Sequence, residues 1–126
     1  MKTTPLQVGG REFRLAFTLD AMCAMEDAIE GFDISKLTDY IRHPKGLVQM
    51  VRILAEQGEL LAGRTLDVDA RWFGQRISPS PASVSRVQMA VLSALSDGMT
   101  METDDGARGE EDVVLSEIKK KETTGV

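Results

Sequence analysis

The feature that most limits the fold of this chain is an alternating stretch that turns at Gly9-Gly10 and leads directly into a helical pattern. After the two glycines, Phe13, Leu15 and Phe17 alternate with polar or small residues, which places all three on one face of a strand. A Gly-Gly pair accepts the positive backbone angles of a two-residue turn. The pattern therefore predicts a β-hairpin. Because an isolated hairpin is only marginally stable in water, its apolar face has to pack on another element.

The expected packing partner is a helix that follows the hairpin at once. Thr18 suits the N-cap, Asp20 complements the positive end of the helix dipole, and Gly31 is expected to end the helix. The apolar residues at near-helical spacing are Leu19, Met22, Cys23, Met25 and Ile29. We predict that Cys23, the single cysteine, is a small buried side chain and not a reactive thiol. A lone cysteine has no partner for an internal disulfide.

Four more helices are expected along the chain, at residues 34–42, from Pro44 to a stop at Gly63, at 65–77 and at 81–97. Proline suits the first position of a helix, and Pro44 and Pro81 both stand where a new apolar periodicity begins. Gly98 is expected to end the last helix. The sequence thus predicts a mainly α fold, in which an N-terminal β-hairpin packs on a bundle of about five helices.

The end of the chain differs from the rest in charge. Of the net charge of −5, the whole excess comes from residues 97–126, with nine acidic and four basic side chains, whereas residues 1–96 hold eleven of each. The stretch 104–112 has little apolar content, which favours a flexible segment. We expect one hairpin-plus-helix domain at residues 1–98 and a flexible acidic tail at 99–126. A short helix at 112–122 is expected when a partner covers its apolar strip.

Composition excludes several classes of protein. The chain of 126 residues is long enough for one core and has no apolar run of the roughly 20 residues that a membrane span needs. Its N-terminus lacks the apolar stretch of a secretory signal, so we expect a soluble protein of the cytoplasm that does not bind membranes. The neutral charge of residues 1–96 argues against binding to nucleic acid.

No catalytic or cofactor-binding motif is found in the sequence. The single histidine, His43, precedes Pro44 at an expected helix junction, which favours a turn or capping role over general-base chemistry. The acidic pair Glu26-Asp27 diverges around a helix and fits a solvated face better than a metal site. Gly9-Gly10 lacks the lysine and hydroxyl of a phosphate loop. We expect no enzyme activity, no metal and no cofactor.

A few apolar residues are candidates for partner binding. Trp72-Phe73 suits either an exposed recognition patch or the core, and filling of a small helical core is the commoner use of such aromatics. The methionines give the same choice: Met22, Met25, Met50 and Met89 fall at core-like positions, whereas others flank the start of the tail. The partner-binding candidates are Trp72, Phe73, Met99, Met101, Leu115 and Ile118.

A resemblance to a known family lies in two segments of the first third. Residues 9–22 read Gly-Gly-Arg-Glu-Phe-Arg-Leu-Ala-Phe-Thr-Leu-Asp-Ala-Met, and residues 25–31 read Met-Glu-Asp-Ala-Ile-Glu-Gly. This combination resembles the start of tail assembly chaperones from long-tailed bacteriophages and related gene transfer agents. Those proteins similarly join a hairpin, a Thr-Leu helix start and an acidic helix that ends near glycine. The likeness is strongest over residues 6–41 and weaker through the helices to residue 98.

The resemblance implies a non-enzymatic chaperone of virion morphogenesis. Such a protein binds the long tape measure protein in the cytoplasm of the bacterial host, keeps it soluble while tail tube subunits assemble around it, and is absent from the mature virion. It acts as a homo-oligomer with many copies along its target. The family often has a longer frameshifted form that recruits tail tube protein. Lys119-Lys-Lys121 suits a slippery site, although three lysines closing a helix are the commoner reason for such a run.

Two other functions remain open at this stage. One is a structural head-tail connector or completion protein of a virion, since its small helical subunits have similar composition. The other is a small helical DNA-binding regulator that uses the helices around Arg64, Arg71, Arg76 and Arg86. The neutral charge of residues 1–96 weighs against the regulator.

Overall fold

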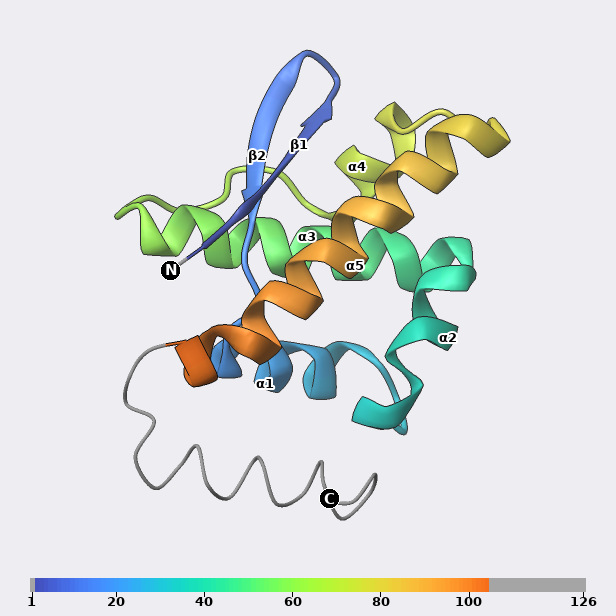
Figure 1. Ribbon diagram of the computed structural model, residues 1–126. Coiled ribbons are helices and arrows are strands. Elements are labelled where there is room, and N and C mark those ends of the chain that lie inside the picture. The colour runs from blue at the N-terminus through green and yellow to red at the C-terminus, as the bar shows by residue number, and fades with distance from the viewer. Residues whose placement is uncertain (1, 105–126) are drawn as a thin grey trace.

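The computed structural model describes residues 2–104, with side chains described through residue 100. It confirms a mainly helical fold with an N-terminal two-stranded antiparallel hairpin (Figure 1). The elements are β1 (Thr4–Val8), β2 (Arg11–Leu15), α1 (Leu19–Ala28), the short 3-10 helix η1 (Ile34–Lys36), α2 (Leu37–Arg42), α3 (Pro44–Leu61), α4 (Ala70–Arg76) and α5 (Pro81–Asp104). The predicted helix at 34–42 is therefore two successive segments, η1 and α2. No helix among residues 2–104 is long and apolar enough to cross a membrane.

The hairpin buries Phe13 and Leu15 as the alternation predicts, but β2 ends at Leu15, so Phe17 is buried beyond the strand and not within it. Leu6 pairs with Phe13 and Thr4 pairs with Leu15, so that Leu6, Phe13 and Leu15 are all buried on one face. Gly9 and Gly10 both have positive φ angles, 59° and 80°, as the tight turn requires. The buried face packs mainly on α3 and α5.

Helix α3 is the centre of the core. It contacts β2 and the helices α1, α2, α4 and α5, and it lies behind α5 in Figure 1. Its buried apolar residues are Leu47, Met50, Val51, Ile53, Leu54 and Ala55. Gly58 of α3 is also buried, and a Cβ atom there would collide with the backbone carbonyl of Arg14. The strand and the helix are thus held at backbone contact, and the Ala16 N–H donates to the Leu54 carbonyl at 3.1 Å.

A small polar network fixes α1 against α3. Thr18 is the N-cap, as predicted, and its hydroxyl accepts from the Ala21 N–H at 3.0 Å. The same hydroxyl donates to Oε1 of the buried Gln57 at 2.6 Å, and Gln57 Nε2 donates to Asp20 Oδ2 at 2.8 Å. Because a buried amide needs partners for both its oxygen and its nitrogen, Gln57 specifies where the start of α1 docks.

The orientation of α1 differs from the prediction. Ala21 and Met25 face the core, whereas Cys23 is exposed and Leu19 is 75% exposed. The prediction that Cys23 is buried was therefore wrong. Anchoring of Thr18 and Asp20 to Gln57 fixes the rotation of α1 about its axis and turns Leu19 and Cys23 outward. The helix also ends at Ala28, before Gly31.

Two helix boundaries were predicted wrongly. The helix expected at 65–77 begins only at Ala70, where the Asp69 side chain accepts from the Trp72 N–H at 2.9 Å. Helix α5 does not end at Gly98 and continues to Asp104. Gly98 serves close packing, because a Cβ atom there would lie 2.5 Å from the carbonyl oxygen of Phe17.

Candidate functional site

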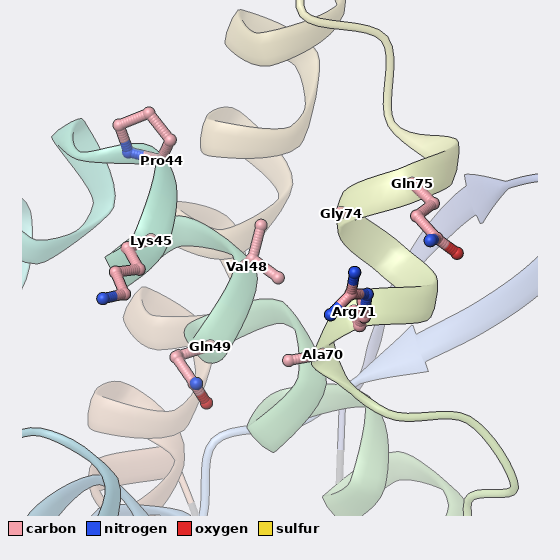
Figure 2. A pocket seen from close by; sticks show the side chains of 8 residues that line it. All are labelled: Pro44, Lys45, Val48, Gln49, Ala70, Arg71, Gly74 and Gln75. Carbon is pink, nitrogen blue, oxygen red and sulfur yellow. The ribbon is translucent and has the colours of Figure 1, made fainter.

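A shallow groove of about 410 Å³ lies between the first turns of α3 and helix α4 (Figure 2). It is open to solvent, and side chains from both helices line it. The lining residues are Pro44, Lys45, Val48, Gln49, Ala70, Arg71, Gly74 and Gln75. We call this feature the α3/α4 groove.

The two helices are placed by local features of the sequence. Pro44 begins α3 directly after His43, which also ends α2. Gly46 allows α2 and α3 to meet closely, because a Cβ atom there would collide with the carbonyl of Tyr40. The Asp69 cap sets the start of α4. The position of both helices is therefore determined by a proline, a glycine and a capping carboxylate.

Glycine also makes the groove hollow. A Cβ atom at Gly74 would lie 3.9 Å from both methyl groups of Val48, which is an ordinary van der Waals distance. Gly74 is exposed and Val48 is half-buried. Ala70, one helical turn before Gly74, is likewise small. The apolar floor is thus made by Val48, Ala70 and Pro44, and the missing side chain at Gly74 leaves space above it.

The rim of the groove carries positive charge. Lys45 and Arg71 are both exposed, and neither forms a hydrogen bond or ion pair within residues 2–104. The other polar lining residues are the amides Gln49 and Gln75, and no lining residue is acidic. An apolar floor between two available cations suits an amphipathic segment with acidic residues beside its apolar stripe.

The lining of the groove is limited to cationic, amide and apolar side chains. It lacks histidine, cysteine, serine and carboxylate side chains. Elsewhere, His43 lies exposed at the α2/α3 junction, where its side chain makes no capping hydrogen bond. Among residues 2–104 no group of three or more histidine, cysteine, aspartate or glutamate side chains is placed to hold a metal ion. Among the described residues, the groove therefore combines an apolar floor with two exposed cations.

The predicted candidates Trp72 and Phe73 belong to an aromatic cluster on the other side of α4. Phe73 is completely buried and packs edge-on against Phe13 of the hairpin at 5.0 Å between ring centroids. The half-buried Trp72 contacts both Arg11 and Arg76, whose guanidinium carbons are 5.5 and 4.4 Å from its ring centroid. Phe73 is therefore a core residue, and Trp72 joins the hairpin to α4.

Arg11 has a second partner beside this cluster. Its Nη2 donates to Asp67 Oδ1 at 3.0 Å. This hydrogen bond, together with one from the Asp67 backbone and the charge of Arg11, lowers the pKa of Asp67 below its ordinary value. The pair ties the extended segment before α4 to the hairpin.

The remaining candidates do not gather with Trp72. Met99 is 49% exposed near the end of α5. Its neighbour Gly98 packs against Phe17, which precedes α1. Met89, predicted as a core residue, is 62% exposed on the outer face of α5. The side chains of Met101, Leu115 and Ile118 lie outside the described residues.

Sequence reasoning missed the groove residues Lys45, Val48, Arg71 and Gly74. The available signal was the pair Ala70 and Gly74, two small residues one turn apart in a helix with few apolar residues. Small residues at that spacing show where the surface of a helix has a depression, but they do not show which element packs opposite it. That information comes only from the tertiary packing of α4 on α3.

Comparison of the chain with protein-family models, with curated proteins and with solved structures finds no match.

Proposed function

We propose that this protein is a tail assembly chaperone of a long-tailed bacteriophage or related particle, which binds the tape measure protein and keeps it soluble. The observation that carries the proposal is the resemblance of residues 6–41 to the start of that family. In the structure this segment includes most of the hairpin, α1, η1 and most of α2. Its Thr-Leu-Asp sequence supplies the contacts of Thr18 and Asp20 with Gln57.

The α3/α4 groove supports the proposal because it suits the expected target. A tape measure protein is long and largely helical, so its chaperone has to cover apolar stripes of helices and release them later. A shallow, open groove with a small apolar floor gives weak contact per copy. Many copies bound along one target then hold it firmly while each contact stays reversible.

Co-expression with the tape measure protein tests the proposal. We expect the tape measure protein to be soluble with the wild-type chain and insoluble without it. Gly74→Leu fills the groove from an exposed position that has room for a Cβ atom, so it should return the tape measure protein to the insoluble fraction. Ser93→Leu makes a similar apolar addition at an exposed site on α5 and is the matched control.

The outcomes separate the family from the site. Equal insolubility with and without the wild-type chain, and no recoverable complex, would exclude the chaperone function. Full solubility with Gly74→Leu would move the binding site away from the groove but leave the function in place. Detection of the protein in purified virions would favour a structural connector, because an assembly chaperone leaves the particle.

A further inference from the structure

We infer that the α3/α4 groove is a binding site for the acidic end of the same chain, residues 110–118, which covers the groove until a partner displaces it. This segment reads Glu-Glu-Asp-Val-Val-Leu-Ser-Glu-Ile. The contact involves this chain alone and does not depend on the identity of any partner. It therefore stands or falls separately from the proposed function.

Charge complementarity is the first argument. The groove presents two exposed cations, Lys45 and Arg71, without partners among residues 2–104, and its lining contains no carboxylate. The segment begins with three consecutive acids, at positions 110–112. Residues 97–126 carry the whole negative excess of the protein, whereas residues 1–96 are neutral. Two cations without partners in the described part of the chain and a segment that begins with three acids thus belong to one polypeptide.

The apolar residues of the segment match the floor of the groove. Val114, Leu115 and Ile118 follow the acids at a spacing that puts them on one side of a helical turn. The floor that they would cover consists of Val48, Ala70 and the open space at Gly74. With the apolar side on this floor, the preceding acids come to the rim, where Lys45 and Arg71 lie.

The length of the chain permits this contact within one molecule. Gln88 of α5 lies beside the end of α2, because its Nε2 donates to the Ile41 carbonyl at 3.0 Å, and Pro44 at the edge of the groove is close in sequence. From Gln88 to Asp104, α5 advances about 24 Å at 1.5 Å per residue. Residues 105–112 span up to about 27 Å when extended. The apolar part of the segment can therefore return to the level of the groove.

The consequence is a groove that is occupied by its own chain at any protein concentration. A partner has to compete with this internal ligand, so only a longer or more complementary apolar stripe would displace it. A chain segment tethered nearby acts at an effective concentration in the millimolar range for a short flexible linker. Even weak intrinsic binding is then enough to cover a shallow groove most of the time.

Paramagnetic NMR on the full-length protein tests the inference. A nitroxide label is attached at Ser116→Cys in a Cys23→Ser background, since Cys23 is exposed and would otherwise be labelled as well. We expect loss of the amide signals of Val48, Gly74 and Gln75, and much weaker loss at Leu61, which lies about 20 Å from Val48 along α3 at 1.5 Å per residue. Uniform signals throughout residues 2–104 would overturn the inference.

Charge reversal provides the specificity control. Lys45→Glu with Arg71→Glu should restore the signals of Gly74 and Gln75, and adding Glu110→Lys with Glu111→Lys should abolish them again. The matched control, Lys2→Glu with Lys36→Glu, changes two cations outside the groove and should leave the signal loss unchanged. Failure of the second charge reversal to recover the effect would overturn the pairing.

A mixed sample establishes that the ligand is the molecule's own segment. ¹⁵N-labelled protein that carries no nitroxide is mixed with nitroxide-labelled protein at natural isotope abundance. Only contacts between molecules can then broaden the observed signals. We expect no loss of the Gly74 signal in this mixture. Loss of that signal would show a neighbouring copy, or an assembly of copies, as the occupant and would overturn the intramolecular contact.

Discussion

Glycines in this protein serve opposite purposes, and the difference predicts the effect of adding a single methyl group. At Gly74 a Cβ atom meets only the Val48 methyls at 3.9 Å, whereas at Gly58 it would collide with the Arg14 carbonyl. We expect Gly74→Ala to raise the free energy of unfolding by about 0.5–1 kcal/mol, because alanine favours the helix and restricts the unfolded chain.

Gly58→Ala should instead lower the free energy of unfolding by about 1–3 kcal/mol, as overpacking does in a close-packed core. Urea denaturation followed by circular dichroism measures both variants. A destabilised Gly74→Ala protein would contradict the open space seen at that position.

The Arg11–Asp67 pair gives a prediction about pH. Its hydrogen bond lowers the pKa of Asp67 below the ordinary value of 3.8. Since the folded pKa lies below the unfolded one, the pair's contribution to stability is present above the unfolded value and is lost as the pH falls through the folded value. Titration of the Asp67 carboxyl carbon by NMR should give a pKa below 3.8 in the wild type. Arg11→Gln should raise it, and Arg64→Gln should leave it unchanged.

At the scale of secondary-structure elements, the docking of α1 depends on Thr18. Thr18→Val removes the N-cap of α1 and leaves Oε1 of the buried Gln57 without its hydroxyl partner. We expect a loss of roughly 2 kcal/mol in the free energy of unfolding, from the missing cap and the unsatisfied amide oxygen. Thr38→Val, at an exposed position within α2, should change stability by less than about 0.5 kcal/mol. Equal effects of the two substitutions in chemical denaturation would contradict the role of the network.

Elements were predictable where local chemistry decides them. The Gly9-Gly10 turn, the Thr18 cap and the helix starts at Pro44 and Pro81 each depend on a few neighbouring residues, and all were predicted correctly. The segment 65–69 was not, because Leu66 and Val68 fit a helical stripe as well as the irregular, half-buried segment that the structure has there. Only the Asp69 cap and the contact of Asp67 with Arg11 distinguish the two.

Two features were not predicted for a different reason: the buried side of α1 and the α3/α4 groove. Cys23 is exposed because Gln57, far away in the sequence, anchors the start of α1. The groove exists because Gly74 of α4 lies opposite Val48 of α3. Both depend on pairs of residues from separate elements, and the periodicity of one element does not contain that information.

For the whole molecule, the single core predicts cooperative unfolding. Trp72, the single tryptophan, contacts Phe13 of the hairpin and Phe73 of α4, and α3 joins the hairpin to α1, α2, α4 and α5. The hairpin therefore has no means of unfolding while the helices stay folded. Tryptophan fluorescence and helical circular dichroism should report the same urea midpoint. A fluorescence transition at lower urea would show that the hairpin and α4 separate from the rest first.

The three glycines at which backbones meet also bear on how such a chain changes during evolution. Gly46, Gly58 and Gly98 bring α3 and α5 against Tyr40, Arg14 and Phe17, and at each of them even alanine would strike a main-chain oxygen. Apolar neighbours can exchange for one another as long as volume is preserved, but these three positions have no substitute of similar size. In distant descendants whose side chains have otherwise drifted, glycines separated by twelve and forty residues would be the mark by which this architecture is recognised.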